Sequence, residues 1–332
     1  MGGNALKNCE TKRYPAHLYY PLEAEVMARL LRDFPDRRVE TIRSYRAKTD
    51  FGDMDVLLES DGLAIDVIDY LRDAFDSKEV VQNSNVYSFE FRNFQVDLIL
   101  TPTLVYQTTA NYFAWNDLGN LLGRVANSTG MSLGHDGLRF SFRDGDYQFD
   151  QRVITKDWEV ALTALGYNYE RWSAGFDTLE DLFRFAASSA FFNRDIYLLH
   201  NRNYRSRTRD AKRKTYMKFL RWLELQPEDF MPAYPRLEHK KEWLPYLFTR
   251  LPGFEQYYVN TKAALEAQQA FKARFNGARL MKLTSLREKA LGRLMERLKA
   301  HFGGPEGLRD WVRVTADPDI DRFVLSFADA LE

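Results

Sequence analysis

The sequence has almost none of the residues that build disulfide scaffolds or zinc sites. Its 332 residues include one cysteine, Cys9, and five scattered histidines. One cysteine cannot form an internal disulfide or a thiolate metal cluster, and the histidines show neither an HExxH motif nor another paired zinc-binding spacing. We therefore expect no internal disulfide and no zinc chemistry.

Long apolar runs are also missing. No stretch approaches the ~20 apolar residues that a membrane span needs, and residues 1–14 carry charges where a signal peptide needs an apolar run. We expect an intracellular protein, cytoplasmic or nuclear, without a membrane partner. With 45% hydrophobic residues but only 18 glycines and 11 prolines, the chain can bury a sizeable core. Its length predicts about two domains.

A net charge is lacking as well, because 47 Lys and Arg residues balance 47 Asp and Glu residues. The balance is a cancellation between two parts. Residues 1–199 hold 21 basic and 30 acidic residues, whereas residues 200–332 hold 26 and 17. This division is typical of a protein in which one part gathers cations and the other meets a polyanion, although solvated helix faces produce the same bias.

Periodicity predicts an α+β fold with a mixed or mostly antiparallel sheet, followed by a mainly helical part. The apolar spacing predicts helices beginning at Pro21, over 63–71 and over about 117–127, the last capped by Asn116. Alternation predicts strands over 39–45 and 53–59 and hairpins over 86–100 and 139–151, which turn at 92–93 and 144–145. Later segments predict a capping box at Thr178 and Asp181 and long helices over 208–226 and 260–302. We place a domain boundary at residue 150, giving domains 1–150 and 151–332.

The most informative stretch contains paired carboxylates. Side chains alternate along a strand, so Asp53 and Asp55 point to one face while Val56 points to the other. Like charges at that spacing favour a hard metal ion between them, although a solvated strand edge would also tolerate them. Asp97 lies in the apolar run 96–100 and needs a partner. If the two strands are neighbours, the three carboxylates converge on one or two magnesium ions.

Two ordered motifs carry a resemblance to a known family. Ser44-Tyr45-Arg46 followed by Gly52-Asp53-Met54-Asp55-Val56-Leu57-Leu58 resembles the Gly-Ser…Gly-Asp-Met-Asp-Val-Leu-Leu signature of DNA polymerase beta-like (family X) nucleotidyltransferases, and Val96-Asp97-Leu98 is similar to their third metal-binding aspartate. The segment 112–120, Tyr-Phe-Ala-Trp-Asn-Asp-Leu-Gly-Asn, with Arg124 after it, is similar to the family's Tyr-Phe-Thr-Gly-Ser-Asp-x-x-Asn segment. Together the motifs cover about residues 40–125.

The resemblance implies a palm-like catalytic domain and a role for each matching residue. Asp53, Asp55 and Asp97 would hold two Mg²⁺ ions, for which Mn²⁺ could substitute, and Asp97 would help activate the primer 3′-hydroxyl. The nucleotide-binding residues would be Ser44 and Arg46 at the triphosphate, with Lys48 and Gly52 beside them, Tyr112 and Phe113 at the sugar, Asp117 and Asn120 at the base, and Arg124 toward the template.

The sequence also departs from the family pattern. Arg43 stands where the family has glycine, and Ala114-Trp115 replaces Thr-Gly. Only residues 1–43 precede Ser44, which leaves no room for the lyase domain of repair polymerases. We therefore expect no deoxyribose-phosphate lyase activity.

A basic cluster near residue 200 is the candidate nucleic-acid surface. It comprises Arg202, Arg205, Arg207, Arg209, Lys212, Arg213 and Lys214. These cations could bind a phosphate backbone without reading its sequence, and Tyr204 and Tyr216 could stack on unpaired bases. The alternative is a charged helix face, which we favour for a second basic cluster over 272–299.

The sequence thus predicts a magnesium-dependent nucleotidyltransferase that adds nucleoside monophosphates from a nucleoside triphosphate to a nucleic-acid 3′-hydroxyl. Because Asp117, Asn120 and Arg124 share one helix face, a template-guided DNA polymerase-like activity is favoured. Two alternatives remain. One is nucleotide transfer to RNA ends, a small molecule or a protein, and the other is a non-catalytic nucleic-acid-binding protein on the same scaffold.

Overall fold

The computed structural model describes residues 5–227 and 240–329, and it divides into two compact units. The first unit is Met1–Ser141 with Gln151–Phe254, and the second is Phe142–Asp150 with Glu255–Glu332. This division differs from the expected boundary at residue 150, because residues 151–254 pack with the preceding part of the chain. No helix in the described ranges combines the length and hydropathy that a membrane span requires.

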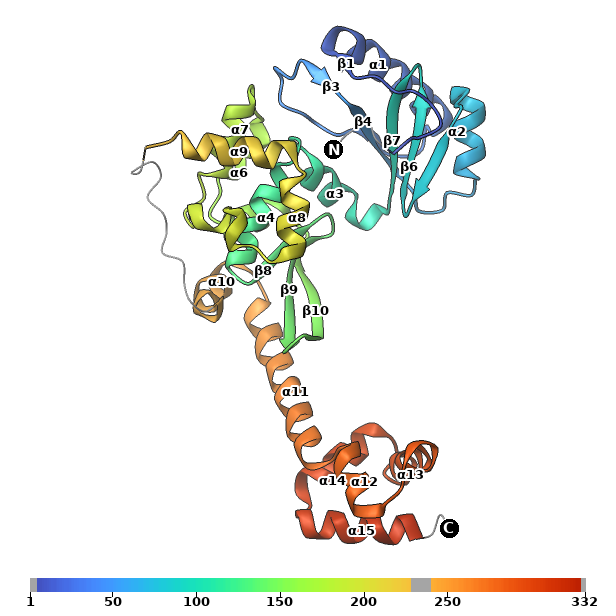
Figure 1. Ribbon diagram of the computed structural model, residues 1–332, viewed down its shortest axis with the longest axis vertical. Coiled ribbons are helices and arrows are strands. Elements are labelled where there is room, and N and C mark those ends of the chain that lie inside the picture. Colours follow the sequence, from blue (N-terminus) through green and yellow to red (C-terminus); the bar gives the residue numbers. More distant parts are fainter. Residues whose placement is uncertain (1–4, 228–239, 330–332) are drawn as a thin grey trace. The chain divides into compact units, whose positions relative to one another are not determined.

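The first unit begins with an α/β part and continues with helices (Figure 1). Its N-terminal elements are β1 (Tyr14–Pro15), α1 (Ala16–Asp33), β2 (Val39–Thr41), β3 (Asp50–Phe51), β4 (Asp53–Glu59), α2 (Val67–Phe75), β5 (Val80–Asn83), β6 (Val86–Phe91) and β7 (Phe94–Thr101). They are followed by α3 (Tyr106–Phe113), α4 (Leu118–Ser128), β8 (Met131–Gly134), β9 (Gly137–Asp144) and β10 (Tyr147–Thr155). The remaining helices are α5 (Trp158–Ala164), α6 (Tyr169–Ala174), α7 (Leu179–Ala186), α8 (Tyr204–Ala211), α9 (Lys214–Glu224) and α10 (Leu244–Arg250).

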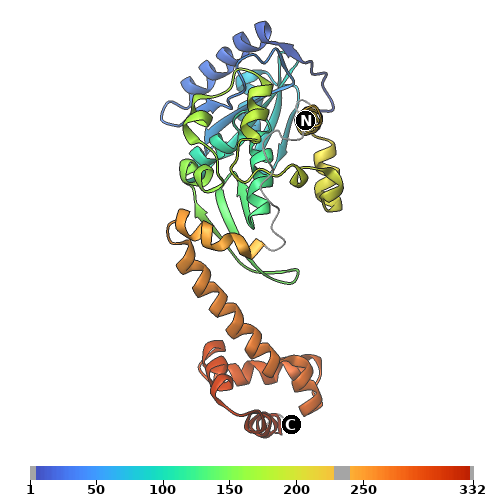
Figure 2. The same ribbon diagram turned by 90° about the vertical axis from the view of Figure 1, so that its left-hand side faces the viewer.

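A five-stranded sheet in the order β2-β4-β7-β6-β5 organises the N-terminal part. The central strands β4 and β7 run parallel, and the other neighbours are antiparallel, which confirms the expected mixed sheet. Met54, Val56 and Leu58 of β4 alternate onto one face and are fully buried in a core that includes residues of α1 and α2. Both helices lie along this face of the sheet (Figures 1 and 2). The opposite face of β4 and β7 carries the acidic residues at one end and, at the other, Leu57 and Ile99, which pack against Tyr106 and Ala110 of α3.

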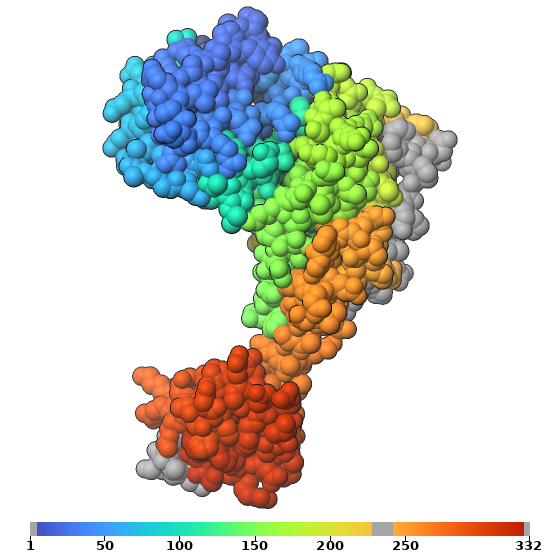
Figure 3. Space-filling view, turned by 180° about the vertical axis from the view of Figure 1, so that it is seen from behind, coloured from blue at the N-terminus to red at the C-terminus, as the bar shows by residue number. Residues whose placement is uncertain are grey.

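Helix α1 begins five residues earlier than expected and contains Pro21 in its interior. An internal proline removes one backbone hydrogen bond and costs ~3 kcal/mol. The upstream turn offsets this cost by burying Tyr19, whose ring stacks on Phe51 at 3.7 Å between centroids. The outer side of α1 forms part of the surface of the first unit (Figure 3). The expectation that Pro21 opens the helix is wrong because tertiary packing outweighs the local preference.

Local turn signals are confirmed more often than long helices. Arg92 and Asn93 both adopt positive φ angles, 53° and 59°, as the tight turn between β6 and β7 requires. Thr178 and Asp181 form the expected capping box of α7. By contrast, the expected helix over 208–226 is two helices, because the chain leaves the helical conformation at Arg213, where ψ is 110°. The turn between β9 and β10 also falls one residue later than expected.

The second unit is helical apart from the tip of the β9–β10 hairpin. Its helices are α11 (Phe254–Arg274), α12 (Gly277–Thr284), α13 (Glu288–His301), α14 (Pro305–Val314) and α15 (Asp317–Asp329). The expected helix over 260–302 is thus broken twice, the second time at Ser285, whose φ is 59°. The core contains the fully buried Leu294, Leu298 and Val324. The mainly helical character expected for the C-terminal part is confirmed.

Helices α3 and α4 approach each other closely at Gly119. A Cβ added there would overlap the carbonyl oxygen of Tyr112 on α3. Gly119 therefore sets the position of Tyr112 relative to α4. Gly123, one turn along α4, has more room, because an added Cβ would lie 3.9 Å from the Leu133 carbonyl oxygen.

We expect Gly119→Ala to lower the free energy of unfolding by about 1–3 kcal/mol, as overpacking does. Gly123→Ala is the matched control in the same helix, and it should raise stability by roughly 0.5–1 kcal/mol because alanine is the better helix former. Urea unfolding monitored by circular dichroism measures both. Equal effects of the two substitutions would contradict the role of Gly119.

Candidate metal centre and its cavity

Three carboxylates meet on the face of the sheet opposite α1 and α2. Parallel pairing sets Asp55 directly opposite Asp97, and Asp53 lies on the same face, two residues before Asp55. One oxygen from each carboxylate lies within 4.8 Å of the others. The expectation that the two strands are neighbours and bring the three acids together is confirmed.

Burial and the neighbouring carboxylates raise the pKa values of Asp55 and Asp97. Burial, followed by the charges of Asp53 and Asp97, raises the pKa of Asp55 well above its usual range. Burial, together with the charge of Asp53, raises the pKa of Asp97 to about 6 against hydrogen bonds that lower it. Burial also lowers the pKa of the nearby Lys48 ammonium, while the carboxylates of Asp53 and Asp55 oppose that shift. Half-buried acids held this close together repel one another, and the charge of Lys48 offsets only part of that repulsion.

The donor set fits a hard divalent cation. All three ligands are carboxylate oxygens, which Mg²⁺ and Mn²⁺ prefer over nitrogen or sulfur. A cation among Asp53, Asp55 and Asp97 would relieve the repulsion that helps to raise the pKa values of Asp55 and Asp97. The three residues can therefore hold a metal ion, and their chemistry alone does not distinguish Mg²⁺ from Mn²⁺.

Asp53 and Asp55 line a cavity of about 560 Å³ within the first unit, whereas Asp97 belongs to the cluster but is not among the lining residues. Three stretches of chain contribute most of its wall. They are the segment from Ile42 to Asp55, the end of α3 through the start of α4, and the α8–α9 corner from Lys212 to Lys218. Its volume is within the range usual for small-molecule sites, roughly 300–1,000 Å³.

Most of the residues expected to bind nucleotide line this cavity. Those present are Ser44, Lys48, Gly52, Tyr112, Phe113, Asp117 and Asn120. Lys212, Arg213 and Lys214, which we expected to bind nucleic acid, line the same cavity. The structure thus joins two groups of residues that lie far apart in the sequence and were expected to have separate roles.

Arg46 has a different position from the one expected. Its guanidinium forms an ion pair with Asp177 at 2.7 Å and donates to the carbonyl oxygen of Ala174 at 2.5 Å. Its backbone N–H donates to the carbonyl of Phe176. Arg46 thus ties the 44–48 loop to the segment before α7, and it is not among the residues that line the cavity.

Arg124 is also placed differently. Its side chain is only 6% exposed and pairs with the fully buried Asp210 of α8 at 2.9 Å. A buried ion pair of this kind fixes two helices against each other, since breaking it would leave an uncompensated buried charge. Arg124 therefore joins α4 to α8 instead of reaching toward a template.

Arg43 and Trp115, which both depart from the family pattern, contact each other. Trp115 has a φ of 64°, the left-handed region that glycine enters most easily, and its N–H donates to the carbonyl of Arg43. The guanidinium of Arg43 lies 4.9 Å from the Trp115 ring and 5.1 Å from the Trp172 ring. Gly175 leaves space for this packing, because a Cβ there would lie 2.6 Å from the Trp115 ring. Aromatic and cation–π contacts thus hold the bend after α3.

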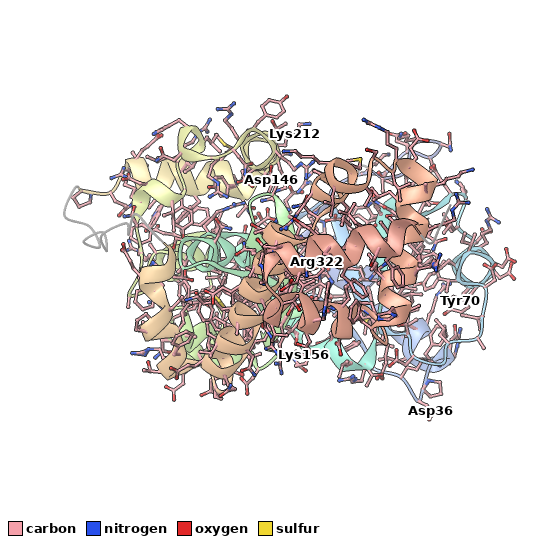
Figure 4. The ribbon with its side chains drawn as sticks, turned by 90° about the horizontal axis from the view of Figure 1, so that it is seen from below. Asp36, Tyr70, Asp146, Lys156, Lys212 and Arg322 are labelled. Atoms are coloured by element: carbon pink, nitrogen blue, oxygen red, sulfur yellow. The ribbon has the colours of Figure 1, made fainter. Side chains whose placement is uncertain are left out.

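The wall at the α8–α9 corner is cationic. Lys212, Arg213, Lys214 and Lys218 line it, and Arg213 is paired with Asp117 at 2.5 Å. Lys212 is exposed at the surface (Figure 4). Helix α9 begins here without a side-chain N-cap, so its first N–H groups add partial positive charge. An anion such as a phosphate chain suits this wall.

Nothing in the sequence indicates that Thr215 and Tyr19 belong to the site, yet both line the cavity together with Lys218 and Arg13. Lys218 follows Lys214 by four residues, so helical periodicity could have placed both on one face. Arg13 of the N-terminal segment pairs with Asp50 at 2.6 Å at the cavity wall.

The N-terminal half of the basic cluster is exposed. Arg205, Arg207 and Arg209 project from α8, and Tyr204 is 76% exposed beside Arg207. Arg202 is half-buried. The expectation that Tyr216 stacks on bases is wrong, because its ring is buried and its hydroxyl donates to the carbonyl of Tyr197 at 2.6 Å.

Comparison of the sequence with models of known protein families gave no match, and a search of curated proteins gave no match either. The function is therefore inferred from the residues and their geometry.

The pKa of Asp97 predicts how stability depends on pH and metal. Its folded-state pKa of about 6 exceeds the value of roughly 4 in an unfolded chain. In the metal-free protein this carboxyl therefore lowers the free energy of unfolding as the pH rises through that window, by at most about 3 kcal/mol. We expect Asp97→Asn to remove this loss, and to remove most of the stabilisation by Mg²⁺ at pH 7.5.

Urea unfolding at pH 4.5 and 7.5, with and without Mg²⁺, tests this expectation. Asp73→Asn is the control, since Asp73 is an exposed carboxyl on α2. The same Mg²⁺ response in Asp97→Asn as in the unaltered protein would contradict the metal centre.

Proposed function

We propose that the protein is a divalent-metal-dependent nucleotidyltransferase that adds nucleoside monophosphates from a nucleoside triphosphate to a nucleic-acid 3′-hydroxyl. One observation carries this proposal. Asp53 and Asp55 of the three-carboxylate cluster line a cavity that is also lined by the cationic α8–α9 corner. An anionic cluster and a cationic wall in one cavity suit a metal-bound polyphosphate.

The proposed reaction is an in-line displacement at the α-phosphorus. The acceptor 3′-oxygen forms a bond to that phosphorus, the bond to the bridging oxygen of the β-phosphate breaks, and pyrophosphate leaves. Bound Mg²⁺ would supply charge neutralisation at the phosphates and a lower pKa for the attacking hydroxyl. Asp53, Asp55 and Asp97 would hold it.

The chain's own residues would divide the remaining tasks. The carboxylate of Asp97 would accept the proton of the attacking hydroxyl, whose own pKa the bound metal ion would lower. Lys212, Lys214 and the N-terminal N–H groups of α9 would bind the triphosphate and the leaving pyrophosphate. This assignment gives the α9 terminus the phosphate role that the resemblance implied for Arg46.

Aromatic and amide side chains of the cavity would receive the nucleoside. Tyr112 and Phe113 present rings, and Asn120 has a buried Nδ2 without a hydrogen-bond partner among the described residues. A buried amide donor needs an acceptor, which a base or sugar oxygen would supply. The sequence favours a template-guided reaction partly because of Arg124. That side chain is paired with Asp210, so it no longer supports a template. We therefore propose transfer to a 3′ end. Primer extension with and without a template strand decides whether the reaction is template-guided.

Primer extension tests the proposed function directly. Each ribo- and deoxyribonucleoside triphosphate is supplied in turn with Mg²⁺ or Mn²⁺, with and without a template strand. We expect metal-dependent incorporation, reduced at least about 100-fold by Asp97→Ala because the proton acceptor and a metal ligand are removed. Asp73→Asn serves as the control. Incorporation by Asp97→Ala at the unaltered rate would overturn the proposal, as would no incorporation under any of these conditions.

The exposed face of α8 is proposed as the track for the acceptor strand. We expect Arg205→Glu combined with Arg207→Glu to weaken binding of a single-stranded oligonucleotide. The slope of log affinity against log salt should become shallower by about 0.7 for each phosphate that the variant no longer neutralises. Lys282→Glu with Lys289→Glu, exposed cations of the second basic cluster, is the matched control. Fluorescence anisotropy across a salt series measures both, and equal slopes in the two variants would count against the track.

A further inference from the structure

The candidate metal ligand Asp97 is connected to the N-terminal segment through one buried amide. Gln95 lies two residues before Asp97 on β7, on the same face of the sheet, and is 2% exposed. Its Nε2 donates to Oδ1 of Asp97 at 2.9 Å, and its Oε1 accepts from the backbone N–H of Ala5 at 3.0 Å. Gln95 therefore links residue 5 to the carboxylate.

The link has a fixed polarity. An ionised carboxylate accepts hydrogen bonds and a backbone N–H donates them. Turning the Gln95 amide over would place its oxygen against the carboxylate and its NH₂ group against the N–H of Ala5, so both contacts would be repulsive. Each partner thus specifies the orientation of the amide, and the amide restrains rotation of the Asp97 carboxylate.

The N-terminal strap, residues 5–12, is itself held firmly to the first unit. The carboxylate of Glu79 accepts from the backbone N–H groups of Lys7, Asn8 and Cys9, at distances between 2.7 and 3.1 Å. Leu6 is 8% exposed, so the strap also contributes to the core. At the other end of the strap, the N–H of Lys12 donates to the carbonyl of Asn93.

The geometry points to Gln95 as a positioning residue of the metal centre, with the N-terminal strap as its support. Gln95 does not act on the substrate. It holds the Asp97 carboxylate in the orientation that a cation shared with Asp53 and Asp55 needs. Partners that orient metal ligands in this way typically contribute about 10–100-fold to metal affinity. This inference rests on the metal centre of the proposed function, but it does not require nucleotide transfer.

The test is Mn²⁺ binding to the full-length protein, measured as free Mn²⁺ by electron paramagnetic resonance. We expect Gln95→Leu to weaken Mn²⁺ binding about 10–100-fold, with a circular dichroism spectrum like that of the unaltered protein. Asp97→Asn is measured alongside. If Asp97→Asn binds Mn²⁺ normally, the proposed metal centre is wrong. If only Gln95→Leu binds normally, the metal centre stands and the role of Gln95 is overturned.

A second pair of variants remains decisive if Gln95→Leu does not fold. Ala5→Pro removes the backbone N–H that donates to Oε1 of Gln95 and leaves Gln95 itself in place, whereas Ala5→Gly keeps that N–H. We expect Ala5→Pro to weaken Mn²⁺ binding several-fold and Ala5→Gly to leave it unchanged. Identical affinities in the two variants would overturn the contribution of the strap.

Cys9 reports whether the strap has been released. Burial and the neighbouring Glu79 raise the pKa of its thiol to about 11, so little reactive thiolate is present at neutral pH. Glu79→Ala should speed maleimide labelling of Cys9 and, in the same sample, weaken Mn²⁺ binding. Faster labelling with unchanged Mn²⁺ affinity would show that the strap does not support the metal centre.

Discussion

The parallel pairing of β4 with β7 is the constraint on which the rest of the structure depends. It places Asp55 opposite Asp97, with Asp53 beside them, and thereby holds like charges together that would separate in a flexible chain. The same pairing buries Met54 and Val56 on the other side of the sheet against α1 and α2. Burial of that apolar face thus stabilises an arrangement that electrostatic repulsion opposes, and a cation among the carboxylates would turn the repulsion into attraction.

Features decided by neighbouring residues could be predicted from the sequence. Strand alternation placed Asp53 and Asp55 on one face, and the turn residues Arg92 and Asn93 fixed the hairpin that brings β6 beside β7. Both follow from backbone geometry over a few residues. The candidate metal centre could be anticipated for the same reason, because only one long-range fact, the proximity of β4 and β7, had to be assumed.

Features decided by distant partners could not be predicted. Arg46 pairs with Asp177, which is 131 residues away, and Arg124 pairs with Asp210, which is 86 residues away. No local pattern distinguishes a cation with such a partner from one that faces a ligand. The break between α8 and α9 is similar, since Arg213 turns out of the helix at the point where it pairs with Asp117. That break brings half of a basic cluster into the cavity and leaves the other half on the surface.

The bend at Trp115 has a consequence for how the cavity can move. A glycine at this position would allow α3 and α4 to pivot, because its backbone samples many conformations. Trp115 is instead packed against Phe176 and Arg43, so the bend is a rigid corner that holds Tyr112 and Asn120 at a fixed spacing. The Lys212–Lys218 corner is attached to this wall by the half-buried Asp117–Arg213 pair and, through α8, by the buried Arg124–Asp210 pair. Buried contacts therefore hold both walls of the cavity at a fixed spacing, which favours a preformed cavity over one that opens and closes.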